Sequence, residues 1–307
     1  MNTVILTSHP FWAYLQLMRP ANIVTAWADI LAGFAASGYI VITDQATAWK
    51  INLIPLGWLL LASTGLYGGG IVFNDVFDAE IDAQERPERP IPSGRASRRG
   101  GTLLGSLLLS TGVVAASQVT SLSAILALSI ALAALFYDAF AKHHPIFGPI
   151  NMGICRGGNL LLGVSVLPAM VREYWFLALI PIVYITAITL LSRGEVHGIK
   201  LSTGIIALLL IVIVISALLG LGLLTNYQLL TALPFLIFFT IKVLLPFIKA
   251  LGKPTPEQIR FAVKSGILSI IILDTSMVAG FAGWPFGLLV LSLLLISIKL
   301  GQIFAVT

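Results

Sequence analysis

Most of the chain consists of long apolar runs separated by short polar segments. Residues 51–74, 100–137, 174–192, 201–241 and 275–298 contain no Asp, Glu, Lys or Arg. A helix needs roughly 20 mostly apolar residues to cross about 30 Å of hydrocarbon, so these runs predict membrane-spanning helices. Polar, turn-like residues interrupt the two longest runs at 117–121 and 225–228, and each of these runs therefore predicts a helical hairpin.

The pattern predicts an all-α, polytopic membrane bundle with ten candidate spans, and nine spans are the alternative. The predicted ranges are 21–42, 53–74, 101–117, 121–140, 147–170, 174–191, 202–223, 228–248, 261–281 and 285–304. Residues 1–18 lack the basic head and apolar core of a signal peptide, so we expect them at the membrane surface. No soluble segment or repeat array interrupts the pattern, which predicts a single membrane domain over residues 1–307.

Charged residues are scarce, at 10% of the chain against 58% hydrophobic residues, which excludes a water-soluble globular protein and a disordered one. Loops after the second, fourth, sixth and eighth spans hold twelve basic residues, whereas the opposite loops hold Lys50 and Arg172. The twelve are Arg86, Arg89, Arg95, Arg98, Arg99, Lys142, Arg193, Lys200, Lys249, Lys253, Arg260 and Lys264. This asymmetry predicts that the first set of loops is cytoplasmic, and it explains the net charge of +5 without nucleic-acid binding.

Six of the thirteen acidic residues fall between residues 75 and 88, at the end of the second predicted span. Asp75, Asp78 and Asp82 are spaced i, i+3 and i+7, which places them on one face if the helix continues. Carboxylates without His or Cys favour Mg²⁺, which characteristically bridges carboxylates to phosphates. Arg86 and Arg89 follow directly and are suited to binding phosphate oxygens. The alternative is a solvated acidic loop followed by a basic one.

These residues resemble a known motif. Asn-Asp-x-x-Asp-x-x-x-Asp from Asn74, followed by Arg-Pro-x-Arg-Pro-Ile-Pro-Ser-Gly, is similar to the first aspartate-rich motif of the UbiA superfamily of intramembrane prenyltransferases. Three further elements resemble the family more loosely: Arg-Pro-x-Asn ending at Asn22, Tyr137 with Lys142, and Arg156 with Asn159.

The resemblance implies a helical bundle, usually of nine spans, in which Mg²⁺ holds an isoprenyl diphosphate whose prenyl group is transferred to an acceptor in the bilayer. It implies that Asp75, Asp78 and Asp82 hold metal, with Asn74 supporting them. The residues expected to neutralise diphosphate are Arg86, Arg89, Lys142 and Lys200, and those expected to line the pocket are Asn22, Tyr137, Arg156 and Asn159. The acceptor, the prenyl chain length and any protein partner cannot be read from the sequence.

The second aspartate-rich motif of the family, expected after the sixth span, is absent. Residues 190–200 read Leu-Leu-Ser-Arg-Gly-Glu-Val-His-Gly-Ile-Lys, a form that resembles the divergent UbiA-like subgroup called EboC. Glu195 is the remaining candidate for a metal-binding and catalytic carboxylate there. Arg193 and Lys200 are candidates for direct diphosphate binding, and His197 is a candidate base or phosphate donor. The alternative is an ordinary connecting loop.

Charged residues inside predicted spans are costly and are candidates for function or for structural pairing. Asp29, Asp274 and Lys242 fit both interpretations, Asp138 is expected nearer the pocket, and Arg156 is expected to face a cavity or an anion. The degenerate second motif leaves a further alternative for the whole chain: a lipid or metabolite transporter or binding protein that retains a prenyl-diphosphate-like site without turnover. A scaffold protein needs neither charged cluster, and the Asp-Gly-x-x-Ala-Arg signature of the CDP-alcohol phosphotransferases is absent.

Overall fold

The computed structural model describes residues 10–39, 52–195 and 198–304. These residues form helices and no strand, as the sequence predicted. The helices up to the middle of the chain are α2 (Pro10–Met18), α3 (Pro20–Ala36), α5 (Ile54–Phe77), α6 (Ala79–Glu85), α7 (Arg98–Ser117), α8 (Ser121–Phe136), the π-helix η1 (Tyr137–Ala141) and α9 (Phe147–Val164). The remainder are α10 (Pro168–Tyr174), η2 (Trp175–Ala178), α11 (Leu179–Ser192), α12 (Leu201–Gly220), η3 (Leu221–Leu223), α13 (Leu229–Gly252), α14 (Pro256–Ala282) and α15 (Trp284–Phe304).

Eight helical segments of the described chain are long and apolar enough to cross a membrane. Each of the ten predicted ranges contains a helix, but α3 and α9 are not among the eight, so the predicted count of nine or ten spans is not confirmed. Helix α3 is described over 17 residues, and α9 carries Asn151, Arg156 and Asn159. Both nevertheless pack inside the bundle, against each other and against other long helices.

Helix ends follow local sequence signals. The hydroxyls of Ser97, Thr120 and Thr255 accept hydrogen bonds from backbone N–H groups in the first turns of α7, α8 and α14. Proline stands at the first or second position of α3, α5, α10 and α14, where a missing N–H costs nothing. The two predicted hairpin turns are confirmed, since α7 ends at Ser117 before α8, and η3 ends at Leu223 before α13.

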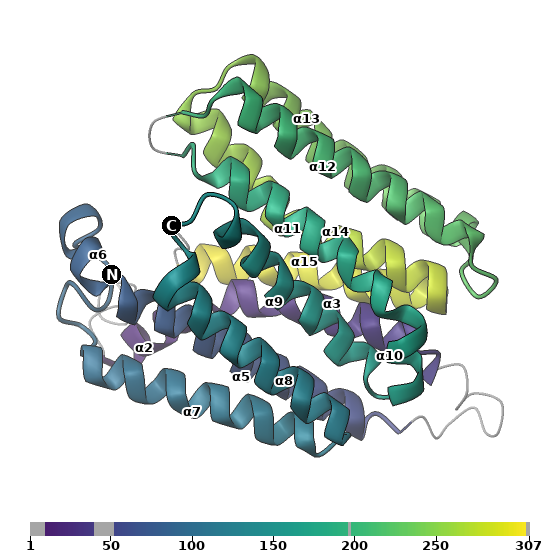
Figure 1. Cartoon of the computed structure of the whole chain (residues 1–307), viewed down its shortest axis with the longest axis horizontal. Helices are drawn as coiled ribbons and strands as arrows, with labels where there is room; N and C mark the ends of the chain where they lie inside the picture. Colours follow the sequence, from purple (N-terminus) through teal and green to yellow (C-terminus); the bar gives the residue numbers. More distant parts are fainter. Residues whose placement is uncertain (1–9, 40–51, 196–197, 305–307) are drawn as a thin grey trace.

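The helices lie side by side with their long axes roughly parallel, as expected for a membrane bundle (Figure 1). Helix α14 is the central member: 78% of its most apolar window is buried, against 22–50% for the other candidate spans. It contacts α3, α11, α13 and α15. Helix α15 also contacts α3, so the last helix of the chain packs beside the first long one.

Glycines allow helices α3 and α9 to approach closely. A Cβ atom on Gly33 would lie 2.0 Å from the backbone oxygen of Leu160, and one on Gly163 would lie 2.4 Å from that of Ile30. Small residues at such crossings are typical of membrane helices, because close backbone packing replaces the hydrophobic driving force. The approach fixes α9, which carries Arg156 and Asn159, against α3, which carries Asn22 and Asp29.

Candidate functional site: a polar-mouthed cavity in the bundle

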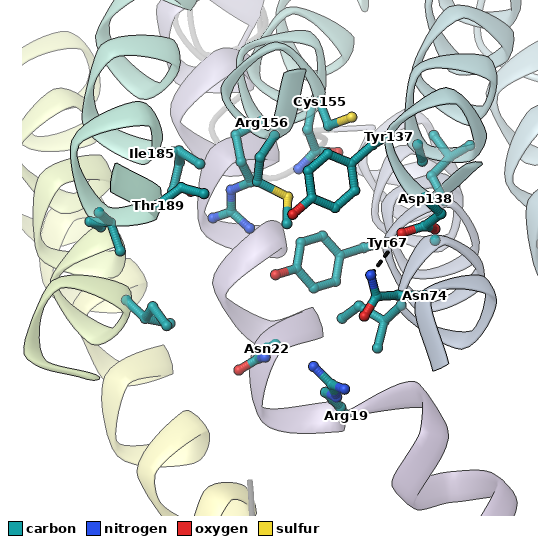
Figure 2. A pocket seen from close by; sticks show the side chains of 18 of the residues that line it. Arg19, Asn22, Tyr67, Asn74, Tyr137, Asp138, Cys155, Arg156, Ile185 and Thr189 are labelled. Carbon is teal, nitrogen blue, oxygen red and sulfur yellow. Dashed lines mark hydrogen bonds between the residues drawn. The ribbon is translucent and has the colours of Figure 1, made fainter. Parts of the chain in front are cut away.

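A cavity of about 340 Å³ lies among α3, α5, α8, η1, α9, α11 and α14. Figure 2 shows side chains from several of these helices converging on it. Its apolar lining comes from residues such as Leu66, Ile71, Ile130, Ile185, Ile188 and Ile270. Seven residues singled out from the sequence line it: Asn22, Asn74, Tyr137, Asp138, Lys142, Arg156 and Asn159. The cavity thus has an apolar wall with polar groups at defined positions.

The aspartate-rich segment, residues 74–82, does not form one continuous helix. Helix α5 ends at Phe77, Asp78 has φ −84° and ψ 0°, and α6 begins at Ala79. That part of the φ/ψ map is sparsely occupied and marks the break, so the expectation of a continuing helix is corrected. The backbone hydrogen bonds from Asp78 to Asn74 and from Asp82 to Asp78 persist, so the direction of the chain changes only locally.

Each of the three aspartates contacts a basic side chain. Asp75 and Asp82 are 5% and 4% exposed, and Arg89 contacts both, at 3.5 Å and 2.6 Å. Asp75 also accepts a hydrogen bond from Arg19 at 2.6 Å. Asp78 instead forms an ion pair with Lys142. The structure therefore brings Asp75 and Asp82 together through Arg89 and directs Asp78 toward η1.

The donor set of this segment fits Mg²⁺ by its chemistry, since three aspartates and one glutamate are present and no sulfur or imidazole. Within the described residues, however, no three His, Cys, Asp or Glu side chains are grouped closely enough to hold an ion. The cations beside the carboxylates are instead guanidinium and ammonium groups.

Arg19 joins α2 to α3 in a strained conformation. Its φ is +48°, in the left-handed region that costs a non-glycine residue about 1–2 kcal/mol. Helix α3 begins at Pro20, directly after Arg19, and the Arg19 guanidinium forms an ion pair with Asp75. Such strain persists where the surroundings over-determine the backbone, which is common at functional sites.

The π-helix η1 brings three polar residues to the cavity. The Lys142 N–H donates to the Tyr137 carbonyl at 2.9 Å, the i to i+5 bond that defines a π-turn. Tyr137, Asp138 and Lys142 all line the cavity as a result. The Asn74 amide donates to Asp138 at 2.8 Å, which fixes α5 to η1 (Figure 2).

A second polar cluster is buried deeper in the bundle. Arg156, which is 3% exposed, forms an ion pair with the fully buried Asp29 at 3.0 Å. It also donates to the side chain and the carbonyl of Thr25, and it stacks over the ring of Tyr67 at 5.4 Å. Asn159 donates to Asp29 at 2.9 Å. Arg156 therefore faces both the cavity and an anion, the two environments that we expected from the sequence.

The second loop contributes less than the first. Arg193 is exposed and donates to the carbonyl oxygens of Lys142 and His144, which holds the end of η1. Lys200 is exposed, and His197 lies outside the described residues. Glu195 is half-buried and lies near Arg86 and Arg260; burial raises the pKa of its carboxyl and the two arginines partly offset this. The loop after α11 thus reaches the end of α6.

Three cavity residues were missed as site residues from the sequence, namely Arg19, Tyr67 and Thr189, whereas Asp138, which was expected nearer the pocket, does line it. A signal for Tyr67 was present: Tyr67, Gly70, Ile71 and Asn74 are spaced i, i+3, i+4 and i+7, and all four line the cavity. The same signal marks Thr189, because Ile185, Ile188, Thr189 and Ser192 have this spacing on α11 and all four line the cavity.

Comparison with known proteins gives one family and one fold. The model of the "UbiA prenyltransferase family" matches residues 31–259. A digeranylgeranylglyceryl phosphate synthase of Methanothrix thermoacetophila is 32% identical over 187 residues, 61% of this chain and 64% of that protein. The synthase of Metallosphaera sedula is also 32% identical, over 61% of this chain and 62% of its own length. The chain thus spans less than two thirds of the length of these curated relatives.

Two solved structures have the same fold. A UbiA homolog from Aeropyrum pernix K1 aligns with a TM-score of 0.67 and 13% identity, over 84% of this chain and 97% of that one. A UbiA homolog from Archaeoglobus fulgidus, bound to GPP and Mg²⁺, aligns with a TM-score of 0.50 and 16% identity, over 94% and 99%. At these identities the likeness supports the fold.

Proposed function

Because the chain belongs to the UbiA prenyltransferase family, we propose that it transfers an isoprenyl group from a prenyl diphosphate to an acceptor within the membrane. The chain is an integral multi-pass protein with eight apolar helices in its described part. One observation carries the proposal: Arg19 and Lys142 line the apolar cavity, and each also contacts an aspartate of the aspartate-rich segment. Cationic side chains suited to binding a diphosphate therefore lie beside a cavity whose apolar lining is suited to a prenyl tail.

The chemistry divides between the two ends of this site. Asp75, Asp78 and Asp82 would hold Mg²⁺, which when bound neutralises charge on a leaving diphosphate. Positively charged residues near the segment would bind the phosphate oxygens; these are Arg19, Arg86, Arg89, Lys142 and, from the second loop, Arg193 and Lys200. Asn74 orients Asp138 at the same end. Fixed cations in a water-poor site stabilise a developing anion more than they would in water.

The apolar end serves the prenyl chain. Leu, Ile and Val side chains line the cavity, so the tail of a prenyl diphosphate would be buried and water kept from the allylic carbon as its C–O bond breaks. Asn22, Tyr137, Arg156 and Asn159 would position the acceptor or the tail. Glu195 is proposed as the single carboxylate that the loop after α11 contributes to this site, with Arg86 near it.

We propose a cytoplasmic position for the aspartate-rich end, on the basis of the twelve basic residues in the loops of that side. The whole chain is proposed as one membrane domain. The named relatives make digeranylgeranylglyceryl phosphate, which supports geranylgeranyl diphosphate as the first donor to test.

The function is tested with the full chain purified in detergent. The protein is incubated with Mg²⁺, prenyl diphosphates of several chain lengths and a membrane lipid extract, and diphosphate release and prenylated lipid are measured. We expect protein-dependent release together with a prenylated product. No diphosphate release across the panel would overturn the proposal. Binding of prenyl diphosphate without bond cleavage would favour the alternative, a transporter or binding protein without turnover.

A further inference from the structure

The cavity contains one carboxylate. Among the described residues that line it, Asp138 is the only Asp or Glu, and no His is present. The other ionisable side chains of the lining are those of Arg19, Tyr67, Tyr137, Lys142, Cys155 and Arg156. Asp138 is therefore the only side chain of the lining that belongs to the Asp, Glu and His set commonly used as general bases.

Asp138 is held firmly in this position. Asp138 is 8% exposed, and its Oδ1 accepts a hydrogen bond of 2.8 Å from the Asn74 amide. Its Oδ2 accepts no hydrogen bond from a described side chain. It lies in the π-turn of η1, an element that occurs frequently at functional sites. No Lys or Arg of the described chain forms an ion pair with it, since Lys142 is paired with Asp78.

Prenyl transfer leaves a proton to be removed. The C–O bond of the allylic diphosphate breaks with its electron pair leaving on diphosphate, and a pair from the acceptor X–H, where X is oxygen or aromatic carbon, forms the new C–X bond. The proton of X must then go to a base. We propose that Asp138 is the catalytic base that accepts this proton. This inference rests on the proposed function and assigns Asp138 a role apart from metal and diphosphate binding.

The competing acceptor is the diphosphate that leaves. It carries several oxygens and is released close to the reaction, so it is the alternative base against which Asp138 must be tested. The two cases differ in a measurable ratio. If Asp138 is the base, its loss slows capture by X–H more than ionisation, and water captures more of the allylic cation.

The experiment uses the full chain with Mg²⁺, geranylgeranyl diphosphate labelled at C1 and a membrane lipid extract as the source of acceptor. Diphosphate release, labelled lipid and labelled geranylgeraniol are measured together. Asp138→Asn keeps an oxygen for the Asn74 contact, Asp138→Glu keeps the carboxylate, and Glu257→Gln is the matched control, because Glu257 is exposed at the start of α14. Retention of cooperative thermal unfolding shows that each variant is folded.

We expect Asp138→Asn to lower labelled lipid about a hundredfold or more, the usual range for loss of a general base. Diphosphate release should fall much less, the ratio of geranylgeraniol to lipid should rise, and Asp138→Glu should restore part of the lipid product. A ratio equal to that of the unaltered protein, or an equal loss of release and lipid, would overturn the assignment. No release from the unaltered protein would overturn the function itself and this inference with it. If Asp138→Asn does not fold, the ratio of geranylgeraniol to labelled lipid in Asp138→Glu decides the assignment in the same way.

Discussion

Arg19 Nη2 donates to Asp75 Oδ1 at 2.6 Å, although the two residues are 56 positions apart in the chain. The contact joins the start of α3 to the end of α5, at the rim of the cavity. Asp75 is buried, so it depends on Arg19 and Arg89 for its neutralisation.

We expect Arg19→Gln to destabilise the protein by about 1–2 kcal/mol, because a charge-assisted hydrogen bond is lost while Arg89 remains near Asp75. Arg98→Gln is the control, since its partner Glu80 is 85% exposed and such pairs contribute little. Thermal unfolding in detergent measures both. Equal melting temperatures for the two variants would contradict the structural role of Arg19.

Removal of the proposed metal ligands should abolish the proposed prenyl transfer. Asp75→Asn combined with Asp78→Asn should lower Mg²⁺-dependent diphosphate release by at least about a hundredfold, because several kcal/mol of charge stabilisation are lost. Excess EDTA should have the same effect on the unaltered protein. Glu80→Gln, at an exposed acid of α6, should retain release. Undiminished release from the double variant would argue against a metal site in this segment.

The buried pair of Arg156 and Asp29 permits a double-mutant test. Arg156→Met should cost about 3–5 kcal/mol, because the fully buried Asp29 would lose its ion-pair partner. Adding Asp29→Asn should recover much of this loss, since no unpaired anion then remains at that position. Unfolding temperatures of the two single variants and the double variant give the coupling. Additive losses would show that the pair is not coupled.

Close packing of α3 on α9 predicts a clear difference between two glycines. Gly33→Ala should destabilise the protein by about 1–3 kcal/mol or more, because the new methyl group would overlap the Leu160 carbonyl. Gly57→Ala places its methyl group in open space and should be neutral or stabilising by up to about 1 kcal/mol. The yield of folded protein and its unfolding temperature distinguish the two. Similar behaviour of both variants would rule out the close crossing.

Local and tertiary features of this chain differ in how well the sequence predicts them. The hairpin turns at 117–121 and 225–228 were predictable, because polar residues in an apolar run mark the only places where the chain can leave the bilayer. The break at Asp78 was not, since Asp78 continues the i+3 pattern and its ion pair with Lys142 joins residues 64 positions apart. Six of the expected substrate-site residues do line the cavity.

The other expected roles depend on contacts between distant segments. Spacing, the absence of His and Cys, and the resemblance to a family motif predict Asp75, Asp78 and Asp82 as a metal set, but neighbours from other helices decide how their charges are neutralised. Arg193 carries no sign in the sequence that it binds the carbonyl groups at the end of η1. Asp138 reaches the cavity through a π-turn, which helical spacing does not predict.

The packing of α14 also bears on how the protein is made. Asp274 is fully buried in α14, near Asp29 of α3 and Arg156 of α9, and neither of its carboxyl oxygens accepts a hydrogen bond from the described residues. Of these three helices α3 is synthesised first, so Asp29 has no cationic partner until α9 supplies Arg156. Asp274, on α14, is synthesised only near the end of translation. Insertion into the bilayer therefore leaves the early helices with an incomplete set of partners, and assembly is finished when α14 and α15 close against α3.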